Sequence, residues 1–145
     1  MLRLTPLALL LAACAGPAVH DETLAGSHWQ LLSIQSMDDA QGTIRVQESA
    51  RYTLSFGSDG CAVLRLDCNR GTGSWQSAAA APDSGSLRFG MLATTRAMCA
   101  PGSLEPRLTR DLPQVRGYLR KDGKLYLTLQ ADGGIYEWAP LPASQ

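Results

Sequence analysis

The sequence predicts an α+β domain in which a strongly curved, mostly antiparallel β-sheet, forming a partial barrel, packs against one helix. Eight short segments place apolar residues at alternate positions, as strands with one buried face do. Residues typical of turns separate most of them, and only one stretch repeats its apolar residues every four positions. The elements therefore fit a single curved sheet with one helix over its opening, and an all-β sandwich is the alternative.

The first residues have the composition of a secretory leader. Arg3 precedes an apolar run from Leu4 to Ala13. Ten helical residues span ~15 Å, about half of a hydrocarbon core, so the run is too short to cross a membrane. It closes on Leu11-Ala12-Ala13-Cys14, which resembles a bacterial lipobox. We expect a lipoprotein signal peptide at residues 1–13 and a diacylglycerol with palmitate-type chains on Cys14; an ordinary leader cut nearby is the alternative.

Cleavage before Cys14 would leave 132 of the 145 residues, divided into a lipidated cysteine with a flexible tether (14–23) and one domain (24–140). Loss of Arg3 leaves 12 basic and 13 acidic residues, with no basic run, which argues against a nucleic-acid partner. No second apolar stretch approaches ~20 residues. We expect a monomer attached to the membrane only through Cys14. Ala15 in the next position favours the outer membrane, facing the periplasm.

Strands are predicted in order along the first part of the domain. The segments are His28–Gln35, Arg51–Phe56, Cys61–Cys68, Ser74–Gln76 and Leu87–Phe89. In the third of them Ala62, Leu64 and Leu66 share one face and Arg65 lies on the other. Turns are predicted at Gly57–Gly60 and Asn69–Gly73, and a loop at Ala78–Gly85.

The period of the apolar residues changes once, in the second half of the chain. Leu104, Leu108 and Leu112 fall four apart, which predicts a helix over Ser103–Leu112 with Ser103 as its N-cap. Pro113 then ends it. Three further strands form a meander: Val115–Arg120, Lys124–Gln130 and Ile135–Trp138.

Several motifs in this order resemble the META domain, the family of the heat-shock protein HslJ. They are Gly26-Ser27-x-Trp29-x-Leu31, Leu66-Asp-Cys-Asn-Arg-Gly-Thr-Gly-Ser-Trp75, Leu87-x-Phe89, Thr94-Thr-Arg96-x-x-Cys99, the leucine helix and Gly134-Ile-Tyr-Glu-Trp138. The resemblance runs from about Leu24 to Trp138. Two positions depart from the family pattern: Cys61 replaces an ordinary strand residue, and Asp67 replaces a common glycine.

Three cysteines remain besides Cys14, and an oxidising compartment favours one disulfide. Cys61 and Cys68 would lie ~23 Å apart along one strand, too far for a bridge. The spacing leaves Cys68–Cys99 and Cys61–Cys99 open. The resemblance implies the Cys68–Cys99 pair, and it implies a link to envelope stress, antibiotic tolerance or secretion rather than to an established reaction.

The sequence contains none of the common catalytic or cofactor-binding motifs that we looked for. His20 lies in the tether and His28 begins a strand, and no spacing of Cys and His suits a zinc site. No nucleophile elbow and no nucleotide-binding glycine motif occurs, and Asp38-Asp39 fits a solvated turn. Cys61 has no His or Lys nearby in sequence, so an unpaired and unreactive thiol is the simpler interpretation. We expect no enzymatic activity, no metal and no cofactor.

The motif residues Asn69, Arg70, Thr95 and Arg96 form the candidate binding patch, because a Cys68–Cys99 bridge would bring their two segments together. Two arginines there could meet an anionic ligand or a partner carboxylate. The competing interpretation places Asn69 in a left-handed turn and pairs the arginines with Asp67 or with carbonyls.

The expected function is therefore a non-enzymatic envelope lipoprotein that contacts a protein or a small ligand. The alternative is a secretion pilot-like or lipid-binding module, which would hold an acyl chain or a peptide in the curved sheet. The cavity of such a module would be lined by Leu64, Leu66, Leu127 and Leu129.

Overall fold

The computed structural model describes residues 14, 23–38 and 40–142. The expected leader, and the tether apart from Cys14 and Thr23, lie outside the described residues. The strands are β1 (His28–Gln35), β2 (Thr43–Arg45), β3 (Tyr52–Phe56), β4 (Cys61–Leu66), β5 (Asn69–Ala81), β6 (Ser84–Phe89), β7 (Ala93–Thr94), β8 (Val115–Lys121), β9 (Lys124–Leu129) and β10 (Ile135–Pro140). The helix α1 (Glu105–Asp111) is followed by the 3-10 turn η2 (Leu112–Gln114), and two further 3-10 turns are η1 (Ser49–Arg51) and η3 (Gln130–Asp132).

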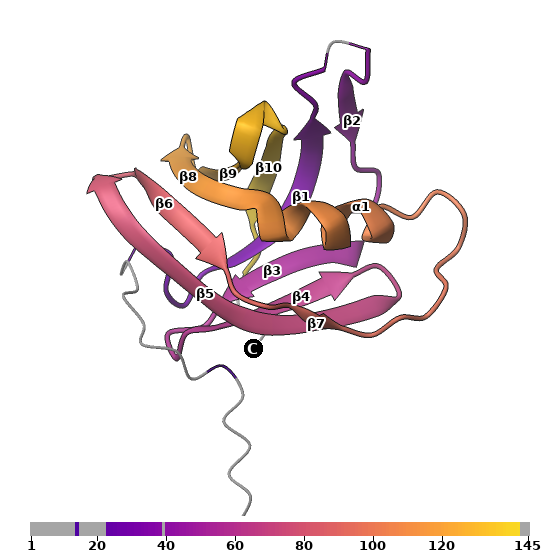
Figure 1. The fold of residues 1–145 in the computed structure, drawn as a ribbon, viewed down its shortest axis with the longest axis horizontal. Coiled ribbons are helices and arrows are strands. Elements are labelled where there is room, and N and C mark those ends of the chain that lie inside the picture. The colour runs from indigo at the N-terminus through magenta and orange to yellow at the C-terminus, as the bar shows by residue number, and fades with distance from the viewer. Residues whose placement is uncertain (1–13, 15–22, 39, 143–145) are drawn as a thin grey trace, which may run out of the picture.

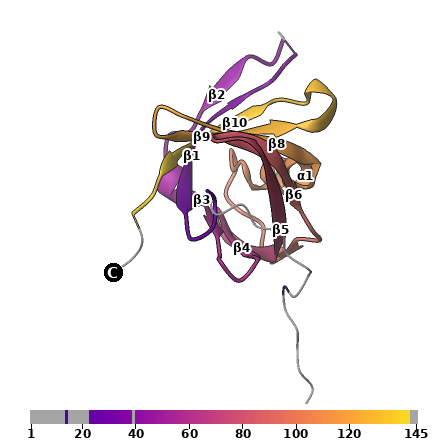
Figure 2. The ribbon, with the colours of Figure 1, turned by 90° about the vertical axis from the view of Figure 1, so that its left-hand side faces the viewer.

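All strands except β2 and β7 form a closed antiparallel barrel. The order β10-β9-β8-β6-β5-β4-β3-β1 returns on itself because β10 also pairs with β1 (Figures 1 and 2). The expectation of a mostly β fold with one helix is confirmed, and the expectation of a partial barrel is wrong. The barrel closes because β10 extends to Pro140, which lies opposite Trp29 in β1, and so covers most of the length of that strand.

Large apolar side chains fill the inside of the barrel. Trp75, Trp138 and Phe56 are fully buried, and Leu64, Leu66 and Leu127 are at most 1% exposed. An eight-stranded barrel is just wide enough for such side chains to fill it, or to hold one small ligand. Apolar residues alternate along the sequence because every second side chain of a strand enters this interior. In β4, Ala62, Leu64 and Leu66 point inward, while Val63 and Arg65 point outward.

The segment Asn69–Gly73 is a strand and not the predicted turn. The reversal occurs two residues earlier, where Asp67 has a φ of 60° and Leu66 pairs with Asn69. Gly71 and Gly73 are needed for close approach: a Cβ on Gly73 would lie 2.6 Å from the Leu92 side chain. The strand prediction Cys61–Cys68 was therefore two residues too long.

The alanine-rich segment 78–85 is also largely strand, where the sequence predicts a loop. β5 continues to Ala81 and pairs with β6, which begins at Ser84. Alanine has a weak intrinsic preference for strands, and here the pairing with a neighbouring strand overrides it. The short strands β2 and β7, which carry no apolar alternation of their own, were not predicted.

The helix packs where the leucine spacing predicts, over one side of the barrel (Figure 1). Leu108 and Leu112 are buried in the core, and Leu104 is half-buried against it. The helix begins at Glu105, two residues later than predicted, so Leu104 and not Ser103 is the N-cap. The Ser103 hydroxyl still accepts a hydrogen bond from the Glu105 amide at 3.2 Å.

Candidate binding surface

A disulfide and a buried asparagine fasten the segment after β7 to the start of β5. Cys68 and Cys99 are joined, with their Cα atoms 5.5 Å apart. Next to the bridge the Asn69 side chain, 1% exposed, donates to the Ala97 carbonyl at 2.9 Å and accepts from the Ala97 amide at 2.8 Å. The amide group of Asn69 thus replaces a strand partner for residue 97. Asn69 has a structural role, and the left-handed turn residue is Asp67.

Thr95 belongs to the same fastening. Its hydroxyl donates to Asn69 Oδ1 at 3.0 Å and accepts from the Arg70 amide at 2.9 Å. The Thr95 amide in turn donates to the Arg70 carbonyl. Of the four residues in the predicted patch, Asn69 and Thr95 therefore hold the backbone and leave the two arginine side chains on the surface.

Arg70 and Arg96 are both exposed. The guanidinium of Arg70 donates only to carbonyls, those of Asp67 at 3.4 Å and Asn69 at 3.2 Å. Among the described residues neither arginine forms an ion pair. Asp67, the carboxylate that the sequence suggested as their partner, pairs instead with Arg51 at 3.6 Å. Both side chains are available to an anion.

Arg65 joins this surface, although sequence reasoning did not include it. It lies directly opposite Arg70 in the β4–β5 ladder, so the two side chains stand on the same outer face. Recognising Asp67-Cys68 as a two-residue hairpin turn would have revealed the pair. We refer to Arg65, Arg70 and Arg96 as the arginine surface. Like charges directly opposite one another destabilise a sheet, and no carboxylate among the described residues forms an ion pair with Arg65 either.

A shallow depression of about 330 Å³ adjoins the arginine surface. It lies between β5 and β7, and its walls are the residues Arg70, Gly71, Thr72, Ala93, Thr94 and Thr95. The Arg70 guanidinium and the exposed Thr72, which lies beside Ala93 on the outer face, suit a compact anionic group. The disulfide and Asn69 hold both walls in place.

Cys14 lies beside Gly73 of β5, which pairs with Ala62 near the start of β4. Its sulfur is 3.5 Å from the Gly73 carbonyl in β5. A hydrogen bond with the Cys14 thiol, followed by burial and the charge of Asp59, raises the pKa of the Cys61 thiol to about 12. Cys61 is therefore a neutral thiol at pH 7 in this setting, and neutral thiols are poor nucleophiles.

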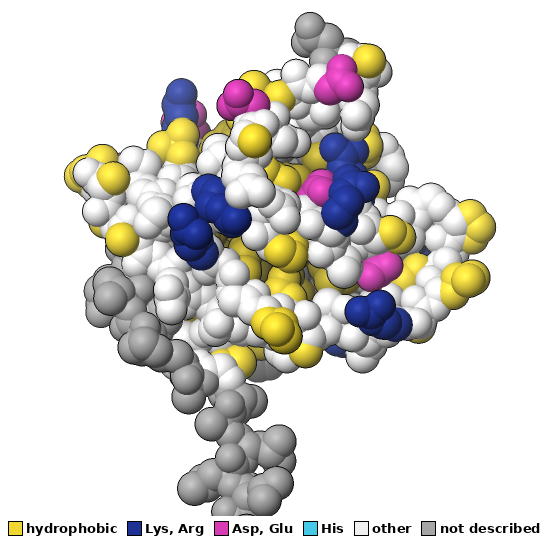
Figure 3. Space-filling view, viewed as in Figure 1, with side chains coloured by type: hydrophobic (Ala, Val, Ile, Leu, Met, Phe, Trp, Pro, Cys, Tyr) yellow, Lys and Arg dark blue, Asp and Glu magenta, His cyan; other side chains and the backbone are white. Residues whose placement is uncertain are grey.

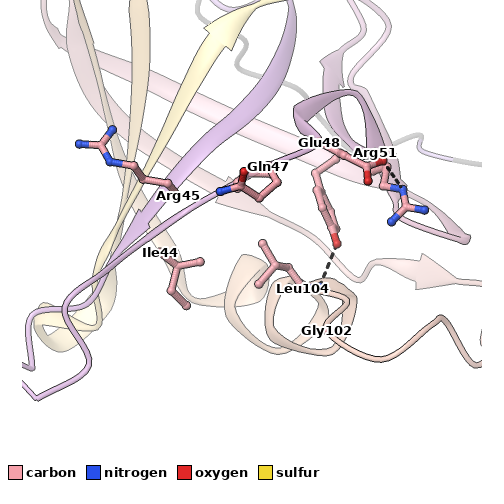
Figure 4. A pocket seen from close by; sticks show the side chains of 9 residues that line it. Ile44, Arg45, Gln47, Glu48, Arg51, Gly102 and Leu104 are labelled. Carbon is pink, nitrogen blue, oxygen red and sulfur yellow. Dashed lines mark hydrogen bonds and ion pairs between the residues drawn. The ribbon is translucent and has the colours of Figure 1, made fainter.

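A second depression of about 180 Å³ separates β2 and η1 from the start of α1 (Figure 4). Glu48 and Arg51 point toward one another there and pair at 3.0 Å, while Arg45 points away. The Tyr52 hydroxyl accepts from the Leu104 amide at 2.9 Å and thereby ties β3 to the helix. The charged groups facing this depression largely satisfy one another.

The remaining sequence candidates that the structure describes do not belong to the arginine surface. His28 hydrogen-bonds through Nδ1 to Ser55 at 2.8 Å, and His20 and Asp39 are outside the described residues. In the described ranges no three His, Cys, Asp or Glu side chains come together as metal ligands would. No helix in those ranges has the length and apolar character needed to cross a membrane.

Comparison with known proteins gives a family and two similar folds. The model of the META domain matches residues 22–138. A protein from Burkholderia xenovorans, solved by NMR, is 23% identical over 89% of this chain and 94% of its own, with a TM-score of 0.63. A DUF4847 family protein from Bacteroides vulgatus is 11% identical over 85% of this chain and 98% of its own, with a TM-score of 0.57. No curated protein matches the sequence.

Proposed function

The chain belongs to the META domain family, and from this premise we propose that it is a non-enzymatic lipoprotein of the cell envelope that binds an anionic group at the arginine surface. The lipobox at Cys14 supports the anchor, and Ala15 supports the outer membrane as its place. The link to envelope stress or antibiotic tolerance rests on what the family resemblance implies.

One observation carries the binding role: the two motif arginines are exposed and without ion pairs among the described residues, on a backbone fixed by a disulfide and Asn69. Because the backbone beneath both arginines is fixed, anion binding costs the rotamer entropy of their side chains but needs no ordering of the backbone. Charge-assisted hydrogen bonds from guanidinium to carboxylate or phosphate are among the strongest that proteins make.

The double variant Arg70→Ala/Arg96→Ala tests this role. Because exposed charges contribute ~0–1 kcal/mol each, the melting temperature should stay within a few degrees of the unmodified chain. In a strain that depends on this protein, survival under envelope stress should fall. The matched control is Arg45→Ala/Lys121→Ala, which removes the same charge from β2 and β8. Unchanged survival of the double variant, or equal loss in the control, would contradict the proposal.

The alternative, a module holding an acyl chain inside the sheet, would need room in the barrel. Leu64, Leu66 and Leu127 occupy that interior, so an acyl chain would have to displace them. Addition of an uncharged long-chain alcohol, which has an acyl-like chain and no anionic group, separates the two ideas. The alternative expects a rise in melting temperature, and the proposal expects none.

A further inference from the structure

The outer face of β4, β5 and β7 combines three features: the arginine surface, exposed apolar side chains and Cys14. Resting on the proposed lipid anchor, we infer that this face lies on the phospholipid surface in which Cys14 is anchored, and that the anions met by the arginine surface are lipid phosphates.

The position of Cys14 is the first step. Its sulfur lies 3.5 Å from the Gly73 carbonyl, beside Cys61, whose side chain points outward from β4. Acyl chains attached to that sulfur would enter the bilayer next to this face. The side of the barrel formed by β4, β5 and β7 is therefore held against the lipid headgroups, while β9 and β10 lie on the other side of the barrel (Figures 1 and 2).

The charge of this region is the second step. From Cys61 to Leu104 the basic residues are Arg65, Arg70, Arg88 and Arg96, and the acidic residues are only Asp67 and Asp83. Asp67 is buried and pairs with Arg51, so it does not face the membrane side. The carboxylate of Asp59, two residues before Cys61, accepts a hydrogen bond from the Cys61 amide at 2.9 Å. A basic face attracts an anionic leaflet, and its attraction falls off within a Debye length.

Exposed apolar side chains are the third step. Met91 is 94% exposed, Met98 99% and Val63 51%, and all three belong to β4 or to the segment from β6 to α1. Figure 3 shows hydrophobic side chains at the outer edge of the loop between β7 and α1. Large apolar side chains that are almost fully exposed suit insertion between headgroups.

Tryptophan placed on two sides of the barrel tests the inference. The chain is isolated as cells produce it, and Cys14 acylation is read by mass spectrometry. Met91→Trp and the control Tyr126→Trp are then reconstituted in vesicles of phosphatidylethanolamine and phosphatidylglycerol with brominated chains. Tyr126 points outward from β9, across the barrel. We expect the brominated lipid to quench the added fluorescence of Met91→Trp and not that of Tyr126→Trp.

Charge variants test whether the arginines attract the barrel to the vesicle surface or whether the acyl anchor on Cys14 alone brings it there. Arg65→Gln/Arg70→Gln/Arg96→Gln, in the Met91→Trp background, should lower the equilibrium between the docked and undocked barrel about fivefold per arginine. The control Arg45→Gln/Arg116→Gln/Lys121→Gln should leave the quenching unchanged. High salt and vesicles of phosphatidylcholine alone should weaken quenching in the same way as the triple variant.

The outcomes distinguish the two proposals. A chain without an acyl group on Cys14 overturns the proposed function and this inference with it. An acylated chain whose Met91→Trp and Tyr126→Trp variants are quenched equally, or whose quenching ignores the arginines, overturns the inference alone. Selective quenching that the arginine variants reduce supports it.

Discussion

At the scale of single residues, the neighbours Asn69 and Arg70 have different roles in this chain. Asn69 is buried and hydrogen-bonds to Thr95, Ala97 and Cys99, while Arg70 points to solvent. Adjacent residues in a strand point to opposite faces, so an Asn-Arg pair can stabilise the fold with one side chain and expose the other.

Replacement of Asn69 by alanine should therefore cost stability. The substitution removes four hydrogen bonds of a buried amide, two with Ala97 and one each with Thr95 and the Cys99 sulfur, and should lower the free energy of unfolding by about 2–3 kcal/mol. Urea unfolding measures the loss. Arg96→Ala, two residues from the Thr94 end of β7, is the control and should change the free energy by less than ~0.5 kcal/mol. Equal stability of the two variants would show that the Asn69 contacts contribute little.

At the scale of elements, the segment from β7 to α1 depends on its cross-link. The Cys68–Cys99 bridge closes a loop over a sequence separation of 31. Loop-closure entropy values such a bridge at roughly 3.5 kcal/mol. Cys68→Ser/Cys99→Ser should lower the free energy of unfolding by about that amount, and Cys61→Ser should not. Non-reducing peptide mapping should link Cys68 to Cys99, and a linked Cys61 would contradict the β4 register.

The end of α1 is tied to β10 by a second polar cluster. The Asp111 carboxylate is 9% exposed, accepts a short hydrogen bond from the Tyr136 hydroxyl, and pairs with Arg110 at 2.8 Å and Arg107 at 3.5 Å. Burial alone would raise its pKa, but the hydrogen bonds from Arg110 and Tyr136 and the two positive charges lower it below the ordinary value. The charged carboxylate therefore stabilises the fold above its unfolded pKa.

This cluster predicts a dependence on acid. Asp111→Asn should lower the free energy of unfolding by about 2 kcal/mol at pH 7. The difference from the unmodified chain should shrink as the pH falls below ~4. In that range the unfolded chain binds a proton at Asp111 while the lowered pKa keeps the folded carboxylate charged, and this favours unfolding of the unmodified chain. Urea unfolding at pH 7 and pH 3 measures both. Asp83→Asn, in the exposed β5–β6 turn, is the control, and a pH-independent difference would contradict the assigned role.

At the scale of the whole molecule, the sequence predicted the fold class and not its closure. The alternation in β4 and the leucine spacing of α1 are local patterns, so they could be interpreted directly. Gly71 and Gly73 suggested a turn, but glycine is needed there because Thr94 and Leu92 pack closely against these two positions. Those two residues lie far along the chain, so a local pattern could not reveal the contact. The same holds for the arginine surface: Arg65 joins Arg70 only through the register of the β4–β5 hairpin.

Barrel closure and attachment give the whole molecule its proposed orientation. Closure leaves one continuous outer surface, on which β4 carries Arg65, β5 carries Arg70 and Arg96 follows β7. Cys14 lies beside Gly73 of β5. Acylation with two or three chains exceeds what stable anchoring requires, so the anchor would need no help from a helix. The proposed function and the proposed orientation therefore both depend on the chemistry of Cys14.

The mass of the chain recovered from membranes tests that dependence most directly. We predict a polypeptide that begins at Cys14, carries diacylglycerol on its sulfur, and leaves the membrane fraction when Cys14 is replaced by serine. A chain that retains residues 1–13, or that begins elsewhere and carries no lipid, would contradict it, as would a Cys14→Ser variant that stays tightly bound to membranes.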